Sequence, residues 1–178
     1  DTLGDVYLPL ADPPLQESLR PLEDDVSDGQ EIEVRTQLDL LWSQWSGMFS
    51  RGFVVTFDYG YPRPLLYSGN RREGTWSCFS RHASNRDLFR DIGKQDITAH
   101  VDCTHLAEAG ARAGFSTSLF TSQGQFLAHA GKDRIQRFLE SAPATEIQKR
   151  AGVVQQLLHP NAMGEAFWVL VQSKETSL

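Results

Sequence analysis

A helical stretch runs almost directly into an apolar strand in the first third of the chain, and this junction constrains the fold more than any other feature. Apolar residues recur three or four positions apart between residues 38 and 49, which predicts an amphipathic helix with Thr36 as its N-cap and Gly52 as its stop. The near-continuous apolar stretch FVVTFD, residues 53–58, follows at once. A helix joined by a short turn to such a strand is half of a β-α-β unit, so we expect an α/β sheet covered on both faces. The apolar helix positions, with both tryptophans assigned to the core, are Leu38, Leu41, Trp42, Trp45, Met48 and Phe49.

An acidic residue, Asp58, stands at the predicted end of this strand and is followed by Tyr59, Gly60 and Tyr61. Ligands of open α/β sheets bind outside the carboxyl ends of the strands, and Gly60 would allow the backbone a tight turn there. Aspartate also commonly caps a loop through its own backbone. The sequence therefore leaves two interpretations of Asp58 open, a functional carboxylate at the sheet edge or a loop cap.

Composition and charge argue against several classes of protein. A length of 178 residues suggests one domain, and 40% hydrophobic with 22% charged residues is ordinary for a globular chain. A net charge of −6 argues against nucleic-acid binding, which needs an excess of Lys and Arg, and no apolar run is long enough to span a membrane. Cys78 and Cys103 are expected to be reduced thiols in a reducing compartment.

Residues 1–30 are rich in proline and acidic residues, and we expect a lead-in segment there. DVYLPL is a candidate edge strand, and the remainder is expected to be loop. The opening DTLGDVYLPL has no Met, which predicts a chain that begins partway through a larger unit, and no signal-peptide pattern is visible.

The second half of the chain continues the α/β pattern. Asp102 is expected to cap a helix that runs from Cys103 to Ala113 and ends at Gly114. The order of the further elements predicts an α/β sheet interrupted by a helical insertion at about 124–159. These elements are a strand in GTWSCFSRH, a strand at 115–121, helices near 124–131, 133–142 and 144–159, and a final strand at 165–174.

The cluster HVDCTH brings together His100, Asp102, Cys103 and His105, all residue types that can bind zinc. The spacing is poor for a metal site, because a helix that starts at Cys103 places Cys103 and His105 on different sides of its first turn. A cap and a small buried thiol explain Asp102 and Cys103 without metal. A Cys-His or Ser-His-Asp device from distant residues stays open, although the chain has no GxSxG elbow.

A basic stretch, RPLLYSGNRREGTW, contains Arg63, Arg71 and Arg72. A solvated loop is its simplest interpretation, and contact with an acidic ligand or partner is the alternative. The chain contains neither a GxGxxG nor a GxxxxGK[ST] motif, so no cofactor-binding glycine loop is expected in it.

Five blocks of the sequence, in order, resemble the MidA-like methyltransferases, and the Glu33-Val34 pair also fits that family. The blocks are FDYGYP, GTWSCFSRH, DITAHVDCTHLAEAG, TSQGQFLAHAG and HPNAMGEAFWVLVQSK. The resemblance implies the C-terminal half of a class I methyltransferase (Rossmann-like) α/β sheet over residues 31–178, incomplete without an N-terminal half. It implies S-adenosylmethionine as the cofactor of the complete protein, and no cofactor for this chain alone, because the glycine-rich loop of the family lies in the N-terminal half. The last strand is expected to run antiparallel to its neighbours.

The resemblance also implies roles for individual residues. Mitochondrial members are associated with arginine methylation during assembly of respiratory complex I, and a guanidinium substrate needs carboxylates to orient it. Asp58 and Glu33 are the catalytic candidates. The substrate-binding candidates are Tyr59, Gly60, Tyr61, His100 and Asp102, although His100 and Asp102 could instead only brace the loop.

Other readings stay open beside methyl transfer. The helical insertion could make the chain an interaction or assembly module without catalysis of its own, and a metal-dependent hydrolase at HVDCTH is a third, weaker idea. The expected partners are a protein substrate and either the N-terminal half or a second copy of the chain. The bacterial cytoplasm is the expected location, with the mitochondrial matrix as the alternative.

Overall fold

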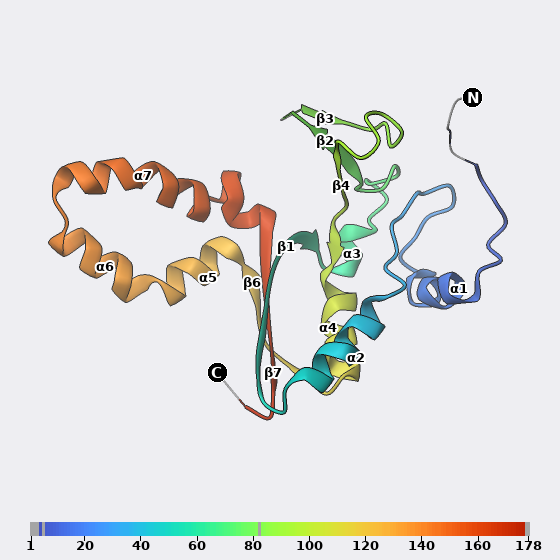
Figure 1. Cartoon of the computed structure of the whole chain (residues 1–178), viewed down its shortest axis with the longest axis horizontal. Helices are drawn as coiled ribbons and strands as arrows, with labels where there is room; N and C mark the ends of the chain where they lie inside the picture. Colours follow the sequence, from blue (N-terminus) through green and yellow to red (C-terminus); the bar gives the residue numbers. More distant parts are fainter. Residues whose placement is uncertain (1–3, 5, 82, 177–178) are drawn as a thin grey trace.

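The computed structural model describes residues 4, 6–81 and 83–176, which form two small sheets and a series of helices (Figure 1). The elements lie in the order α1 Pro13–Leu19, η1 Arg20–Leu22, α2 Leu38–Met48, β1 Gly52–Tyr61, α3 Arg63–Leu66, β2 Ser77–Ser80, β3 Ala83–Asn85, β4 Asp96–Thr98, β5 Val101–Asp102, α4 Cys103–Arg112, β6 Ser116–Ser122, α5 Gln123–Ala130, α6 Lys132–Ser141, α7 Ala144–Leu158, η2 Pro160–Gly164 and β7 Phe167–Lys174.

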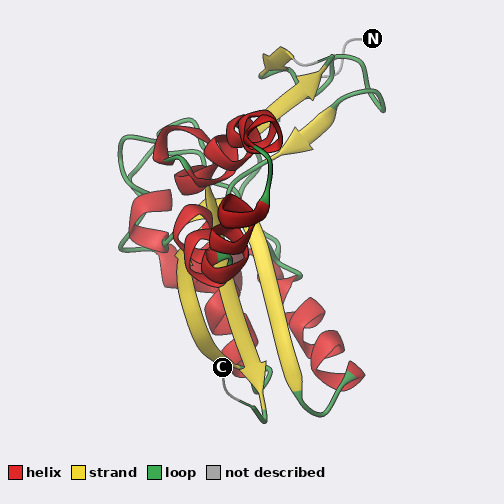
Figure 2. Ribbon diagram, turned by 90° about the vertical axis from the view of Figure 1, so that its left-hand side faces the viewer, coloured by secondary structure: helices red, strands yellow, loops and turns green. Residues whose placement is uncertain are grey.

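The main sheet has the strand order β5-β1-β7-β6. β7 lies between β1 and β6 and is antiparallel to both, so the predicted orientation of the last strand is confirmed. β5 is parallel to β1, and the two pair only at the carboxyl end of β1, where Gly60 faces Val101 and Tyr61 faces Asp102. The predicted α/β class is confirmed, in a sheet that is mostly antiparallel (Figure 2).

α2 covers one face of this sheet together with α4. Trp42 is fully buried and contacts Phe115, with ring centroids 5.0 Å apart, which confirms its place in the core. The predicted N-cap is wrong: Gln37, not Thr36, precedes the first helical residue, and no side chain caps this end. The helix also ends earlier than predicted, because Phe49 already has extended backbone angles.

The other face of β1 is only partly covered. Phe53, Val55 and Phe57 are 42%, 49% and 44% exposed, while the alternate residue Val54 packs on the core beneath α2 and α4. The expectation of a sheet covered on both faces is therefore wrong for the described chain. A strand with two apolar faces exposes one of them when helices pack on a single side.

The lead-in segment, residues 1–30, contains more helix than predicted. Residues 6–10 of the candidate edge strand have no strand pairing, and residue 5 lies outside the described residues. A helix, α1, replaces the expected loop, and it starts at two prolines, which suit the first turn of a helix. Leu22 after it forms a second small core with Leu66 and Tyr67.

Helices expected at about 124–159 are present as α5, α6 and α7, which extend away from the main sheet (Figure 1). The strand predicted in GTWSCFSRH is also present, as β2. It is the middle strand of a separate antiparallel sheet, β3-β2-β4, that the sequence did not predict. Among the described residues, no helix has the length and apolar character needed to cross a bilayer.

Candidate functional site

The carboxyl ends of β1 and β5 meet at one edge of the main sheet, and a glycine makes this meeting possible. A Cβ atom on Gly60 would lie 2.2 Å from the carbonyl oxygen of Val101 and 2.9 Å from its backbone nitrogen. Gly60 lies within β1, not in a turn as predicted, and its role is to let the two backbones approach.

Three of the predicted substrate-binding side chains gather at this edge. The ring of His100 contacts the rings of Tyr59 and Tyr61, with centroid distances of 5.7 and 5.4 Å. Phe167 of β7 packs on Tyr59 from the other side. The guanidinium of Arg71 lies 4.2 Å from the centroid of the Tyr61 ring. We call Tyr59, Tyr61 and His100 the aromatic wall.

The backbone of His100 is hydrogen-bonded, whereas its ring nitrogen Nδ1 has no hydrogen-bond partner among the described residues. The backbone N–H of His100 donates to Oγ1 of Thr75 at 2.9 Å. Nδ1 is buried and has no hydrogen-bond partner among the described residues. Burial, followed by the positive charge of Arg71, lowers the pKa of His100 below its ordinary value of 6.5, so the imidazole is neutral at neutral pH.

The lowered pKa of His100 predicts a pH dependence of stability. Below pH 6.5 the unfolded chain binds a proton at this position more readily than the folded chain. The stability that the neutral ring contributes is present above pH 6.5 and is lost as the pH falls from 6.5 through the lowered pKa. His100→Gln should therefore flatten the decline of unfolding free energy between about pH 7 and about pH 5, measured by urea denaturation. The same substitution at the exposed His129 should leave the decline unchanged.

Glu33 is connected to the aromatic wall by hydrogen bonds through Thr75. Its carboxylate accepts hydrogen bonds from the backbone N–H groups of Thr75 and Trp76, at 2.7 and 2.8 Å, and from the Thr75 hydroxyl at 2.9 Å. The same hydroxyl accepts the N–H of His100, so Glu33, Thr75 and His100 form one chain of contacts. Both carboxylate oxygens are engaged, which favours a positioning role for Glu33.

Asp58 lies inside β1, three residues before its end and opposite Trp168 of β7, so the predicted strand end is wrong. Its Oδ1 atom accepts the backbone N–H of Tyr59 at 2.8 Å, which is the local contact expected of a capping aspartate. Successive side chains of a strand point to opposite faces, so Asp58 and Tyr59 lie on different sides of the sheet. The carboxylate is near enough to Cys103 for its charge to raise the pKa of that thiol, after burial and Asp102. No hydrogen bond engages Oδ2 within the described chain.

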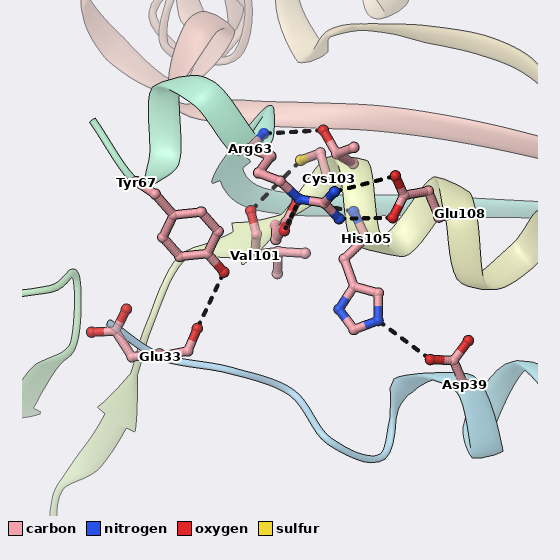
Figure 3. Close-up of polar contacts among 10 residues, drawn as sticks. Glu33, Asp39, Arg63, Tyr67, Val101, Cys103, His105 and Glu108 are labelled. Atoms are coloured by element: carbon pink, nitrogen blue, oxygen red, sulfur yellow. Dashed lines mark hydrogen bonds and ion pairs between the residues drawn. The ribbon is translucent and has the colours of Figure 1, made fainter. Parts of the chain in front are cut away.

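Asp102 braces the site. It caps α4 as predicted, since its Oδ1 accepts the N–H of His105 at 2.9 Å, and it is only 4% exposed. Its Oδ2 atom accepts Nε of Arg63 at 3.2 Å, and the same guanidinium pairs with Glu108 at 2.7 Å (Figure 3). Burial lowers the pKa of Arg63, but these carboxylates raise it by more. Asp102 therefore fixes α3 to the start of α4.

The remaining members of HVDCTH have local roles. Burial, with Asp102 and Asp58, raises the pKa of Cys103 to about 12, so its thiol stays protonated at neutral pH and is a poor nucleophile or metal ligand. His105 Nε2 lies 3.4 Å from Asp39, whose pKa is lowered mainly by its hydrogen bond from Arg112 (Figure 3). The described residues contain no group of three or more metal-ligating side chains.

A cavity of about 660 Å³ borders this network, and the predicted site residues Glu33 and Asp102 line it together with Arg63, His105 and residues of α1, α2 and α4. Several of its charged side chains already pair with one another, including Arg63 with Glu108 and Arg112 with Asp39. Tyr67 also lines it and donates to the carbonyl of Glu33 at 3.3 Å, while burial raises the pKa of its phenol to about 12.

Sequence reasoning missed three contributors to the site. Arg63 is not part of a solvated loop but starts α3 and pairs with acids of its own chain. Thr75 joins Glu33 to His100, and Arg71 lies over Tyr61. Arg63 follows the observed end of β1 by two residues, but the predicted strand end at Asp58 concealed this, and nothing local distinguishes Thr75.

The residues at this edge do not by themselves fit S-adenosylmethionine. A nucleoside cofactor needs a carboxylate for its ribose hydroxyls and a glycine-rich backbone for close approach. Both oxygens of Glu33 already accept hydrogen bonds, and the sequence has no GxGxxG motif to provide the glycine-rich backbone. The described residues thus provide one wall of a site, which includes the buried Nδ1 of His100 without a hydrogen-bond partner among these residues.

A family model described as "Putative S-adenosyl-L-methionine-dependent methyltransferase" matches residues 2–121. Comparison with curated proteins gives no match.

Two solved structures from Burkholderia thailandensis are similar to this chain, each at 32% sequence identity. One is a protein described as uncharacterized; the superposition has a TM-score of 0.82 and covers 92% of this chain. The other is described as a "likely methyl transferase" bound to S-adenosyl-homocysteine, with a TM-score of 0.83 over 96% of this chain. The present chain spans 44% of the length of each.

Proposed function

Because this chain belongs to the family described as "Putative S-adenosyl-L-methionine-dependent methyltransferase", we propose that it forms the acceptor-binding side of such an enzyme. The observation that carries the proposal is the aromatic wall at the carboxyl edge of β1 and β5, with the buried, unpaired Nδ1 of His100. Ligands of open α/β sheets bind at this edge.

Methyl transfer needs positioning and electrostatics more than a protein nucleophile. In the proposal, Tyr59 and Tyr61 hold the acceptor against the edge of the sheet. His100 is neutral and its buried Nδ1 has no partner among the described residues, so it would take the proton that a nitrogen or oxygen acceptor loses on methylation when the bound acceptor reaches it. Asp58 lies on the other side of the sheet from Tyr59, but its negative charge favours the protonated form of His100 and would stabilise that ring once it has taken up the proton. Glu33 and Asp102 keep the surrounding loops in place.

A guanidinium is the acceptor that we propose. The Tyr61 ring already carries the guanidinium of Arg71 at 4.2 Å, which supports a surface suited to planar cations. Arginine methylation of a protein substrate, connected with assembly of a respiratory complex, is the proposed activity of the whole protein. The bacterial cytoplasm, with the mitochondrial matrix as the alternative, is the proposed location.

We further propose that the chain is the C-terminal half of a MidA-like methyltransferase domain. Two observations support this: the chain spans 44% of its structural neighbours, and Phe53, Val55 and Phe57 leave an apolar face of β1 exposed. β1 also has one edge that pairs with β5 only at Gly60 and Tyr61. The rest of the domain would cover that face and supply the cofactor-binding loop, and a second copy of the chain is the alternative partner.

The proposal predicts separable effects on acceptor and cofactor in the complete protein. Tyr61→Ala should lower kcat/KM for an arginine-containing protein substrate about 10-fold or more, because about 1.4 kcal/mol of acceptor contact is lost. Cofactor affinity, measured by calorimetry with S-adenosyl-homocysteine, should stay unchanged. The 178-residue chain alone should give no binding heat in the same titration.

Equal loss of cofactor affinity in Tyr61→Ala would show that the wall holds the cofactor instead. A complete protein that binds the cofactor but methylates no arginine would exclude the proposed acceptor. One that binds neither cofactor nor acceptor would favour the assembly module without catalysis.

A further inference from the structure

The arm formed by α5, α6 and α7 extends away from the main sheet (Figure 1). α5 holds its base, since its first residues Gln123 and Gly124 are buried, with Gln123 donating to the carbonyl of Leu157. Neither α6 nor α7 contains a buried residue. The outer two helices of the arm therefore do not cover the sheet, and their amphipathic sequences need another explanation.

A groove of about 890 Å³ separates α6 from α7. Leu139 and Val154 in it are 53% and 39% exposed. Amphipathic helices normally bury such a stripe against a neighbour, and a contiguous exposed apolar surface marks an interaction site in many soluble proteins. The apolar side chains that line the groove are Ile135, Phe138, Leu139, Ile147, Val154 and Leu158.

The rim of the groove is basic. Its ionisable lining residues, within the described part of the chain, are Arg134, Arg150 and His159, and no carboxylate lines it. Arg150 lies 5.6 Å from the Phe138 ring centroid, and its partner Glu146 is 3.5 Å away on the same helix. Residues 124–159 contain five Lys or Arg and three Asp or Glu, a net charge of +2 in a chain of −6. The arm is thus the basic part of an acidic protein.

We propose that this groove binds one amphipathic helix of a partner protein, with Asp or Glu residues on both sides of its apolar stripe. α6 is 10 residues long, which gives a groove of about 15 Å, the length of roughly three helical turns. Docking of an apolar helix face in such a groove is a common form of peptide recognition. A second copy of the arm fits less well, because two basic rims would face each other. The proposal is independent of methyl transfer.

The test uses the full chain and three labelled synthetic peptides of about 18 residues. One peptide is an amphipathic helix with leucines on one face and glutamates beside them, the second replaces the glutamates with lysines, and the third scrambles the first. Fluorescence anisotropy should show binding of the acidic amphipathic peptide alone, and its affinity should fall with added salt because the rim charges are exposed.

Two adjacent valines provide a matched pair of variants. Val154 lines the groove, whereas Val153 does not, although it is 59% exposed on the same helix. Val154→Asp should weaken binding of the acidic peptide about 10-fold or more, and Val153→Asp less than about 2-fold. Arg134→Glu should weaken it more than Arg137→Glu, which lies outside the groove. Circular dichroism checks that each variant keeps its helices.

Several results would overturn the proposal. One is equal binding of the acidic and lysine peptides, and another is equal effects of the two valine variants. The third is failure of the full chain to bind the acidic peptide. Sedimentation that shows a dimer of the chain, dissociated by Val154→Asp, would assign the groove to a second copy instead.

Discussion

Replacing Gly60 with valine is expected to destabilise the chain by about 3 kcal/mol, the upper part of the range for overpacking substitutions. The new Cβ would lie 2.2 Å from the carbonyl oxygen and 2.9 Å from the backbone nitrogen of Val101. These are backbone atoms, so no rotamer change can relieve the contact, and β5 must move away from β1. Urea denaturation should show a lower midpoint, and the aromatic wall should lose its geometry because Tyr59, Tyr61 and His100 flank this contact.

Gly47→Ala is the matched control for this prediction. Gly47 lies inside α2, and a Cβ there meets no atom within 4 Å. The alanine should therefore stabilise the chain by up to about 1 kcal/mol through helix propensity. If Gly60→Val unfolds at the same urea concentration as the wild type, the β1–β5 contact is not a tight one.

Elements with strong local signals could be predicted from the sequence. The helix over Leu38–Met48 has clear three-four periodicity, and Asp102 before α4 is a capping residue in a capping position. The strand at Ser116–Ser122 and the three arm helices are bounded by glycine or proline, which mark the ends of elements. These features depend on residues close together in the chain.

The features that could not be predicted depend on distant partners. β1 continues past Asp58 because Trp168 and Phe167 of β7, more than 100 positions later, pair with Asp58 and Tyr59. Pairing with β5 then extends it to Tyr61. The close approach that requires Gly60 is likewise set by Val101 on another strand. The residues of the candidate edge were identified from the sequence, whereas the role of each was decided by the strand or helix that reaches it.

Asp58→Asn in the complete protein is expected to lower methyl transfer about 10²-fold, the usual effect of losing one preorganised polar contact. The fold should be retained, because an asparagine oxygen can still accept the N–H of Tyr59, now made at 2.8 Å by Oδ1. What disappears is the negative charge on Oδ2, the oxygen that no hydrogen bond engages within the described residues. The measurement is single-turnover methyl transfer, with urea denaturation of the same variant.

Glu33→Gln tests whether Glu33 only holds the loop around Thr75 in place, in contrast to the part in the reaction proposed for Asp58. The two oxygens of Glu33 accept three hydrogen bonds. Glutamine has an NH₂ group in place of one of these oxygens, so at least one of the three hydrogen bonds is lost. The expected result is a loss of stability of about 1–3 kcal/mol, with methyl transfer falling only as far as the loop around Thr75 is displaced. Stable Asp58→Asn protein with unchanged turnover would remove Asp58 from the reaction. A Glu33→Gln protein that is stable but inactive would show that Glu33, assigned here to positioning, acts on the acceptor directly through its charge.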